Sequence, residues 1–418
     1  MAGVLTGNLL GFVRVAVTAY LLGTHSRADT LAVAMGPIDT LNSVLINSIV
    51  FAFVPMLTAA AEDRRPGLFR QLFRLFTLVF TALTVALMVA APWLMRVLAP
   101  GLDLHYFGAA VVLLRIFALS TLATGLSAVY CALLFTDRRF GLFAFYPAAI
   151  NGCTVAGALA LWKLLGIYGF AIGYTTGACV QLAVLYFVTH RELAGARDSA
   201  DPVDWREILA KPAFFVVYAT GLGLNVIFTR AWATHLGPGM AAAFDYCLRG
   251  VTVPVAILVN PITNSLLPEI ARLRSLVRWR QAFRLIDKTI ALTAAAAVGG
   301  CGFALLFRRP AIALLFQRGS FTEQSTLMVS AVFLGMAPSL VGWSLIEVAA
   351  RSLFALDRPW PPVIAAAIPL IVNVVFTLGQ NSRQPEWLGL GATLGLLLGF
   401  GTLFILMHGN RRRRLMEP

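Results

Sequence analysis

The chain has 418 residues, of which 59% are hydrophobic and only 12% are charged, and its mean hydropathy is +0.81. Soluble domains are about half apolar and about one quarter charged, so this composition excludes an ordinary soluble domain and indicates an integral membrane protein. The formal net charge of +14 would also suit nucleic acid. However, the arginines lie in loops between apolar runs, so we expect membrane lipids as their partners and no nucleic acid.

Apolar runs of about 20 residues or more, the length that a helix needs to cross about 30 Å of hydrocarbon, recur along the whole chain. Twelve of them predict an all-α integral membrane protein with about 12 transmembrane helices. In chain order the runs are Val4–Leu22, Thr30–Ala59, Leu72–Leu98, Phe107–Leu134, Phe140–Leu165, Gly169–Val188, Pro212–Ala233, Met240–Leu267, Phe283–Phe307, Leu327–Leu353, Pro362–Leu378 and Leu388–Met407. The first run lacks a small-residue cleavage pattern after it, so we expect a retained helix and not a signal peptide.

Arginines gather in the loops that follow the even-numbered runs. Examples are Arg64 and Arg65, Arg138 and Arg139, and the tail Arg411–Arg414, whereas the loops after odd-numbered runs are short and poorer in charge. The basic residues Arg308, Arg309 and Arg318 are the exception. This asymmetry predicts a multi-pass membrane protein with both termini in the cytoplasm.

Two distant segments are nearly alike and indicate an internal duplication. Ala132–Arg139 and Ser352–Pro359 each close an apolar run with an Asp-Arg corner, and the next run reaches Asn151 or Asn373. We predict an N-terminal six-helix lobe over 1–190, a linker over 191–211, a C-terminal six-helix lobe over 212–408 and a basic tail over 409–418. Halves with an even number of spans share one orientation, so we expect a pseudo-two-fold axis along the membrane normal and a cavity between the halves.

Charged residues inside the apolar runs are the candidates for transport. An unpaired charge in hydrocarbon costs at least about 2.5–3.5 kcal/mol, so such residues normally face a partner or a cavity. Arginine predominates among them, and its planar guanidinium suits a ligand that carries phosphate or carboxylate. The candidates are Arg14, Asp39, Arg115, Arg230, Asp245, Arg249 and Glu347.

Pairing within the protein is the structural alternative for two of these sites. Asp245 and Arg249 lie four residues apart, so they can neutralise one another on one helix face and still line a cavity. Arg14 lies in the middle of its run and is the hardest to explain by structure alone. Asp39 is a candidate counter-ion for it.

The remaining candidates have simpler explanations. Glu347 lies one turn before Arg351, so we expect the two to form a structural pair. Arg115 and Arg230 lie near the ends of their runs, where their side chains can extend to the membrane interface. A role in binding the ligand is the alternative for both arginines.

A set of motifs along the whole chain resembles the MurJ/MviN family of lipid II flippases. The most specific is Phe316–Thr322, which reads Phe-Gln-Arg-Gly-x-Phe-Thr. The others are Leu9–Arg14, Tyr20–Gly23, Ala28-Asp29, Ala52–Pro55, Ala99–Gly101, Arg249–Pro254, Leu266–Pro268 and Arg351–Asp357.

The resemblance implies a two-lobed transporter of the bacterial inner membrane that moves undecaprenyl-pyrophosphate-linked peptidoglycan precursor by alternating access. We expect it to be a monomer. By position, Arg14, Asp29 and Arg249 match functional charged residues of the family. Arg115 and Arg230 are further candidates for holding the pyrophosphate. No cofactor is expected, and turnover would draw on the membrane potential or a monovalent cation. Some relatives bind sodium, but Asn373 and Thr377 share a helix face without an acidic partner.

The chain departs from the family pattern at several charged positions. The family has charged residues at the positions of Asn8, Val15, Leu41, Asn42 and Thr252, and often two further C-terminal helices, which we expect this chain to lack. A flippase for another polyprenyl-linked oligosaccharide, a multidrug exporter of the same superfamily and a non-transporting membrane scaffold therefore remain alternatives. No nucleophile-base set or metal-ligand spacing points to an enzyme.

Overall fold

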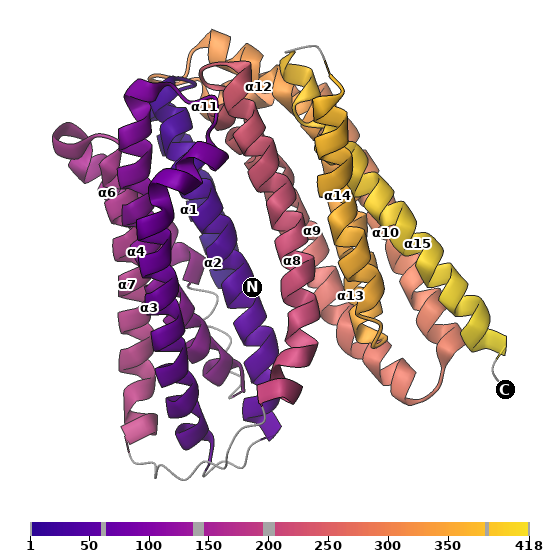
Figure 1. The fold of residues 1–418 in the computed structure, drawn as a ribbon. Helices are drawn as coiled ribbons and strands as arrows, with labels where there is room; N and C mark the ends of the chain where they lie inside the picture. The colour runs from indigo at the N-terminus through magenta and orange to yellow at the C-terminus, as the bar shows by residue number, and fades with distance from the viewer. Residues whose placement is uncertain (1, 60–63, 137–145, 195–204, 381–383, 417–418) are drawn as a thin grey trace. The chain divides into compact units, whose positions relative to one another are not determined.

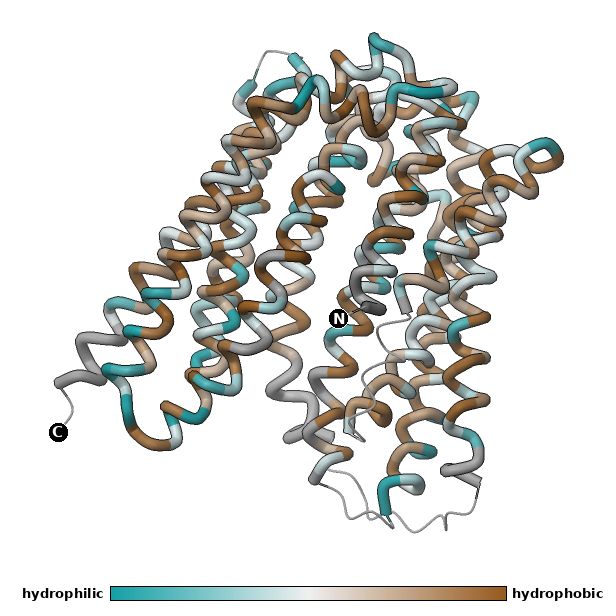
Figure 2. The backbone as a smooth tube through the Cα atoms, turned by 180° about the vertical axis from the view of Figure 1, so that it is seen from behind, coloured by the Kyte–Doolittle hydropathy of each residue, from teal (hydrophilic) through white to brown (hydrophobic). Residues whose placement is uncertain are grey.

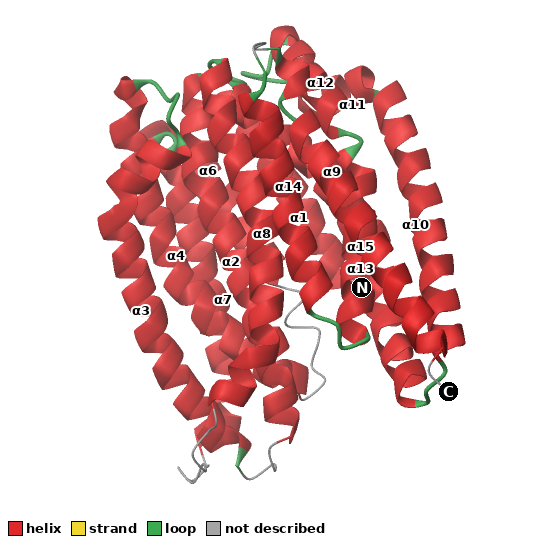
Figure 3. Cartoon of the chain, turned by 45° about the vertical axis from the view of Figure 1, so that its right-hand side comes forward, coloured by secondary structure: helices red, strands yellow, loops and turns green. Residues whose placement is uncertain are grey.

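The computed structural model describes residues 2–59, 64–136, 146–194, 205–380 and 384–416. These residues are almost all helical and contain no strand (Figure 3), which confirms the predicted all-α class. The chain divides into two compact units, Met1–Val216 and Val217–Pro418. The lobe boundaries predicted at 190 and 212 stay predictions, since residues 195–204 lie outside the described part of the chain.

The N-terminal unit is built around one central helix. Its helices are α1 (Ala2–Leu22), α2 (Ser26–Ala59), α3 (Arg65–Leu98), α4 (Leu104–Thr136), α6 (Tyr146–Leu165) and α7 (Tyr168–Ala194), drawn in indigo to magenta in Figure 1. Helix α4 packs against α2, α3 and α7, and α6 packs against α1 and α7. Because α4 is covered on several sides, most of its residues from Ala110 to Leu134 are buried.

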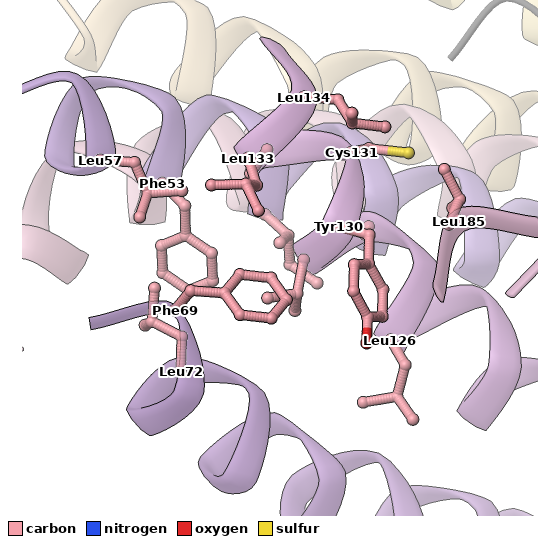
Figure 4. Packing of buried hydrophobic residues seen from close by; sticks show 14 of the residues in the cluster. Phe53, Leu57, Phe69, Leu72, Leu126, Tyr130, Cys131, Leu133, Leu134 and Leu185 are labelled. Carbon is pink, nitrogen blue, oxygen red and sulfur yellow. The ribbon is translucent and has the colours of Figure 1, made fainter. Parts of the chain in front are cut away.

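A cluster of buried aromatic and aliphatic side chains joins α2, α3, α4 and α7 (Figure 4). The rings of Phe69 and Tyr130 lie 5.0 Å apart between their centroids, and the ring of Phe53 meets that of Phe76 edge-on at 5.1 Å. Leu185 of α7 adds to the same cluster. Such contacts exclude water and lipid and fix the packing of the four helices.

The C-terminal unit has a central helix of its own. Its elements are α8 (Trp205–Leu236), which begins before the unit boundary, α9 (Met240–Ser275), α10 (Trp279–Leu306), α11 (Arg308–Phe316), α12 (Glu323–Met336), α13 (Ser339–Ala355), α14 (Trp360–Leu378), the 3-10 helix η1 (Pro385–Trp387) and α15 (Leu390–Met416). Helix α13 packs against α9, α10 and α15, and α14 packs against α15. Helix α14, which follows the second copy of the repeated motif, thus packs against the next long helix of its unit, α15, as α6 packs against α7 in the N-terminal unit.

Ten helices among the described residues are long and apolar enough to cross a membrane, or eleven if the bent pair α12 and α13 is counted as one span. Leu9–Leu22 is a shorter apolar helix. Hydrophobic residues follow the lengths of the helices, and hydrophilic ones gather toward their ends (Figure 2). The chain is therefore a multi-pass membrane protein, and the number twelve stays a prediction.

Two predicted boundaries are wrong in detail. The run Leu327–Leu353 is two helices bent by 42°, because Pro338 lacks an amide hydrogen and its ring disfavours a continuous helix. The short helix α11 lies in what was expected to be a loop. The last predicted run, Leu388–Met407, agrees with the candidate span Pro385–Gly409, and helix α15 continues to Met416. The first Asp-Arg corner, at Asp137, lies outside the described residues.

The most specific motif of the sequence, Phe316–Thr322, forms the corner between α11 and α12. Gly319 has a φ of 61°, a conformation that glycine adopts without strain. Thr322 caps α12 in a capping box with Ser325. Phe316 and Phe321 both contact the ring of Tyr246 on α9. These contacts give the motif a structural role within the C-terminal unit.

Candidate functional site

The central charge of the N-terminal unit is held by a partner from the next helix. Arg14 on α1 donates from Nη2 to Oδ2 of Asp39 on α2 at 3.3 Å, which confirms the predicted counter-ion. The Arg14 side chain is only 3% exposed, whereas that of Asp39 is 33% exposed. The Tyr174 hydroxyl on α7 donates to the other carboxylate oxygen of Asp39 at 3.0 Å. Arg14 and Tyr174 thus both bind the carboxylate of Asp39, and the three residues connect α1, α2 and α7.

A second layer of contacts positions Tyr174. Its ring meets Phe117 of α4 edge-on, with centroids 5.4 Å apart, and its hydroxyl also interacts with the side chain of Asn42. Asn42 in turn donates from Nδ2 to the Ser120 hydroxyl of α4 at 3.1 Å. The sequence analysis did not identify Tyr174. It lies on a helix far along the chain from Asp39, so no spacing pattern in the sequence connects the two residues. Asn42 was noticed only as a departure from the family pattern.

The C-terminal unit contains a matching pair on its own first two helices. Arg230 on α8 contacts Oδ1 of Asp245 on α9 through Nε at 2.8 Å and Nη2 at 2.7 Å. Its guanidinium lies over the ring of Phe244, 5.8 Å from the centroid. The expectation that Arg230 extends to the membrane interface is wrong, since the residue is buried. Burial is tolerated because the charge is paired.

In both pairs the carboxylate is the more accessible member. The exposed fractions of the side chains are 33% against 3% for Asp39 and Arg14, and 23% against 6% for Asp245 and Arg230. The side chain of each arginine is therefore covered by neighbouring residues, whereas part of the side chain of its acidic partner is exposed. A count of charges in the sequence suggested an arginine-lined interior, but it could not reveal this difference in exposure.

A third charged group of the C-terminal unit confirms another predicted pair. Arg351 contacts Oε1 of Glu347, one turn earlier on α13, at 2.7 Å. The Tyr218 hydroxyl of α8 donates to the other oxygen of Glu347 at 3.0 Å, and Arg351 Nη1 donates to the Thr263 hydroxyl of α9 at 3.3 Å. A carboxylate held by both a tyrosine and an arginine thus occurs in each unit.

The other predicted site residues lie apart from these pairs. Asp29 is buried in the first turn of α2, where a negative charge favours the positive end of the helix dipole. Arg115 is exposed on α4 and donates from Nε to the Met88 carbonyl of α3 at 3.1 Å. Arg249 is half-buried, one turn after Asp245. Their roles in binding stay predictions.

Asn373 of α14 anchors a small polar cluster on α8. Its Nδ2 donates to Asn225 Oδ1 and to the Thr229 hydroxyl, both at 2.8 Å, and its Oδ1 accepts from Thr377 at 3.3 Å. In the N-terminal unit Asn151 of α6 donates to the Gly7 carbonyl of α1 at 3.2 Å. Each repeated asparagine thus reaches the first helix of its own unit. Within the described part of the chain, no group of three or more His, Cys, Asp or Glu could hold a metal ion.

Comparisons with known proteins identify relatives over nearly the whole chain. The family model described as "Lipid II flippase MurJ" matches residues 18–416. A "Lipid II flippase MurJ" of Burkholderia cenocepacia is 26% identical over 437 aligned positions that cover 99% of this chain and 83% of the relative. A "Probable lipid II flippase MurJ" of Rhizobium meliloti is 25% identical and covers 90% of this chain and 72% of the relative.

Solved structures support the same fold. A structure of "Lipid II flippase MurJ, inward closed conformation" superposes with a TM-score of 0.82 at 18% identity, covering 97% of this chain and 87% of that one. An inward-facing multidrug resistance MATE family transporter of the MOP superfamily reaches a TM-score of 0.83 at 12% identity, with 98% and 96% coverage. At these identities the likeness concerns the fold alone.

Proposed function

The chain belongs to the lipid II flippase MurJ family, and on that premise we propose that it carries lipid II across the bacterial inner membrane by alternating access. The observation that carries the proposal is the family match over residues 18–416. The cargo is then a polyprenyl chain joined through pyrophosphate to a peptidoglycan precursor. Delivery of this precursor to the outer leaflet would supply cell-wall synthesis. The family is one of transporters, so the protein moves its substrate without changing its covalent bonds.

The arginines of the apolar helices support recognition of an anionic headgroup. Arg14 on α1 and Arg249 on α9 match charged positions of the family, and guanidinium binds phosphate oxygens in bidentate fashion. Asp29, Arg115 and Arg230 are supporting candidates in the proposal. The excess of arginine after the even-numbered runs supports an orientation with cytoplasmic termini.

The proposal is tested by complementation. A bacterial strain is depleted of its own lipid II flippase while this chain, wild type or Arg14→Ala, is supplied in trans. Survival and the amount of lipid II in the outer leaflet are measured. We expect the wild type to restore both and Arg14→Ala to fail, because alanine removes the guanidinium that would contact the headgroup.

The control is Arg272→Ala, an exposed arginine near the end of α9 that is paired with an exposed Glu269. It should complement like the wild type, since exposed ion pairs contribute little to stability. Membrane insertion of each variant is checked by fractionation. If the inserted wild type fails to restore outer-leaflet lipid II, the assignment of this substrate is wrong, and another polyprenyl-linked glycan becomes the substrate to test.

A further inference from the structure

We propose that Arg115 binds the phosphate of an anionic phospholipid on the exposed face of helices α3 and α4, and that a backbone carbonyl freed by Pro92 positions the guanidinium for this contact. The inference goes beyond the proposed transport and does not depend on it. In the transport proposal Arg115 is a supporting candidate for the headgroup of the cargo, so the two ligands are compared directly in the test.

Proline at position 92 removes one backbone hydrogen bond from α3. In an α-helix each amide donates to the carbonyl four residues earlier, but proline has no amide hydrogen. Pro92 lies inside α3, so the carbonyl of Met88 loses the donor that it would otherwise have. Arg115 of α4 donates from Nε to this carbonyl at 3.1 Å. A side chain of the neighbouring helix thus replaces the missing backbone donor.

The same hydrogen bond prepares the guanidinium of Arg115 for an anion. Among the residues that the structure describes, Arg115 makes no other hydrogen bond or ion pair. The N–H groups of Nη1 and Nη2 are therefore available to a ligand. Because the guanidinium is rigid and planar, a contact at Nε restricts the positions of Nη1 and Nη2. Two nitrogens held in one plane can bind two phosphate oxygens at once.

The surface around Arg115 is apolar. In the first half of α4 the exposed residues Gly108, Val112, Arg115 and Leu119 recur every three or four positions, so they lie on one face of the helix. Val112 and Leu119, one turn before and one turn after Arg115, are both exposed. On α3, Val89 is exposed as well, and only 17% of the apolar part of this helix is buried. An exposed apolar surface on membrane-spanning helices is suited to contact with lipid.

The level of Arg115 along the helices suits a lipid phosphate. Its Nε contacts the carbonyl of Met88, which lies ten residues before the end of α3 at Leu98, or about 15 Å along the helix. Helix α3 has 34 residues and is therefore about 50 Å long, against about 30 Å of hydrocarbon. When α3 stands upright and centred in the bilayer, Nε lies about 5 Å inside the hydrocarbon. A lipid phosphate lies just outside that boundary, where the terminal nitrogens of an arginine can reach it.

Charge complementarity favours an anionic phospholipid as the ligand. A guanidinium inside the hydrocarbon is costly unless a negative group neutralises it, and no acidic side chain pairs with Arg115 among the described residues. Phosphatidylglycerol carries one phosphate and one net negative charge, so it balances one arginine. A zwitterionic lipid brings an ammonium group that competes for its own phosphate. The pyrophosphate of the cargo carries more negative charge than a single arginine neutralises.

The test measures the binding of single lipid molecules by native mass spectrometry. The full chain, purified in detergent, is titrated separately with phosphatidylglycerol, phosphatidylethanolamine and farnesyl pyrophosphate. Arg115→Gln should weaken the tightest binding of phosphatidylglycerol at least about tenfold, because charge-assisted hydrogen bonds are lost. It should affect phosphatidylethanolamine less. Arg309→Gln on α11 is the matched control, since Arg309 is also exposed and makes no hydrogen bond or ion pair in the described part of the chain.

Pro92→Ala tests whether the freed carbonyl positions Arg115. Alanine restores the backbone amide that donates to Met88, so the guanidinium competes for the carbonyl and is held less firmly. Binding of phosphatidylglycerol should weaken severalfold when Arg115 is present and should not change when Arg115→Gln is already in place. An equal loss in both backgrounds contradicts the positioning role, because Pro92 would then act independently of Arg115.

The lipid site itself is overturned by either of two results. Equal weakening by Arg115→Gln and Arg309→Gln would show only the general effect of one positive charge. Loss of farnesyl pyrophosphate binding without loss of phosphatidylglycerol binding would place Arg115 among the contacts of the cargo and so support the proposed function instead. If Arg115→Gln is not recovered folded, Arg115→Lys replaces it. Lysine keeps the charge but lacks the planar fork, so phosphatidylglycerol binding should fall severalfold, and unchanged binding contradicts the inference.

Discussion

Arg230 directs two nitrogens at a single carboxylate oxygen of Asp245, at 2.8 and 2.7 Å, and so joins the first two helices of the C-terminal unit. The same helices of the N-terminal unit are joined by Arg14 and Asp39. In both places a short loop connects the two helices, and the arginine is the covered member. The two pairs therefore occupy corresponding places in the two units.

Loss of the Asp245 charge should destabilise the protein strongly. Asp245→Asn leaves Arg230 buried with its charge uncompensated, and breaking a buried pair in this way typically costs about 3–5 kcal/mol. Because Asp245 is 23% exposed, we expect the lower end of that range. Thermal unfolding of the purified protein in detergent, followed by tryptophan fluorescence, measures the loss as a lower midpoint.

The matched control for that variant is Asp357→Asn. Asp357 is 76% exposed, and its pair with Arg274 is 3.8 Å long, so little stability depends on its charge. Its φ of 60° is tolerated by asparagine. Equal midpoints for the two variants would contradict the structural importance of the buried pair.

Removal of the Tyr218 hydroxyl should destabilise the protein less than loss of the Asp245 charge. Tyr218→Phe deletes one hydrogen bond to Glu347, which keeps Arg351 as a partner. A hydrogen bond to a charged group contributes about 1.5–3 kcal/mol, and the remaining ion pair should hold the loss near the lower value. The thermal midpoint is compared with that of Tyr20→Phe, because Tyr20 is 52% exposed. If the midpoint falls further for Tyr20→Phe than for Tyr218→Phe, the hydrogen bond to Glu347 does not contribute to stability as we expect.

The two repeated asparagines should differ in their contribution to stability. Asn373→Ala removes bonds to Asn225 and Thr229 and leaves buried polar atoms without partners, at about 1–3 kcal/mol for each unsatisfied group. Asn151→Ala removes one bond to the Gly7 carbonyl. We expect the midpoint to fall further for Asn373→Ala. The reverse order would mean that the α8 cluster is not a main stabilising contact of its unit.

Close packing between α6 and α7 depends on glycine. A Cβ at Gly173 would overlap the Cys153 carbonyl oxygen, and one at Gly157 would lie 2.7 Å from the Gly169 carbonyl oxygen. Gly173→Ala should therefore separate the two helices and destabilise the N-terminal unit by about 1–3 kcal/mol. Gly302→Ala on α10 is the control, because a Cβ added there would meet no atom within 4 Å, and alanine favours a helix by about 1 kcal/mol. A neutral Gly173→Ala would contradict the close approach.

Much of the fold could be predicted because membrane helices are encoded locally. A run of apolar residues long enough to cross hydrocarbon must satisfy its own backbone hydrogen bonds, so it forms a helix whatever it packs against. Pairs at one-turn spacing, such as Glu347 and Arg351, follow from the same geometry. The bend at Pro338 and the added helix α11 were missed, because hydropathy over a long window does not resolve breaks within an apolar run.

The sequence by itself determined the membrane class, the helical architecture, the repeated asparagines and the family, since each of these depends on local composition or on ordered motifs. Only the tertiary structure decided which charges meet and which of them are accessible. Asp245 pairs with Arg230 on a neighbouring helix, and Tyr174 reaches Asp39 across 135 positions of the chain. The physical reason is that burial and pairing depend on which helix faces pack together, and this is set by contacts between segments far apart in sequence.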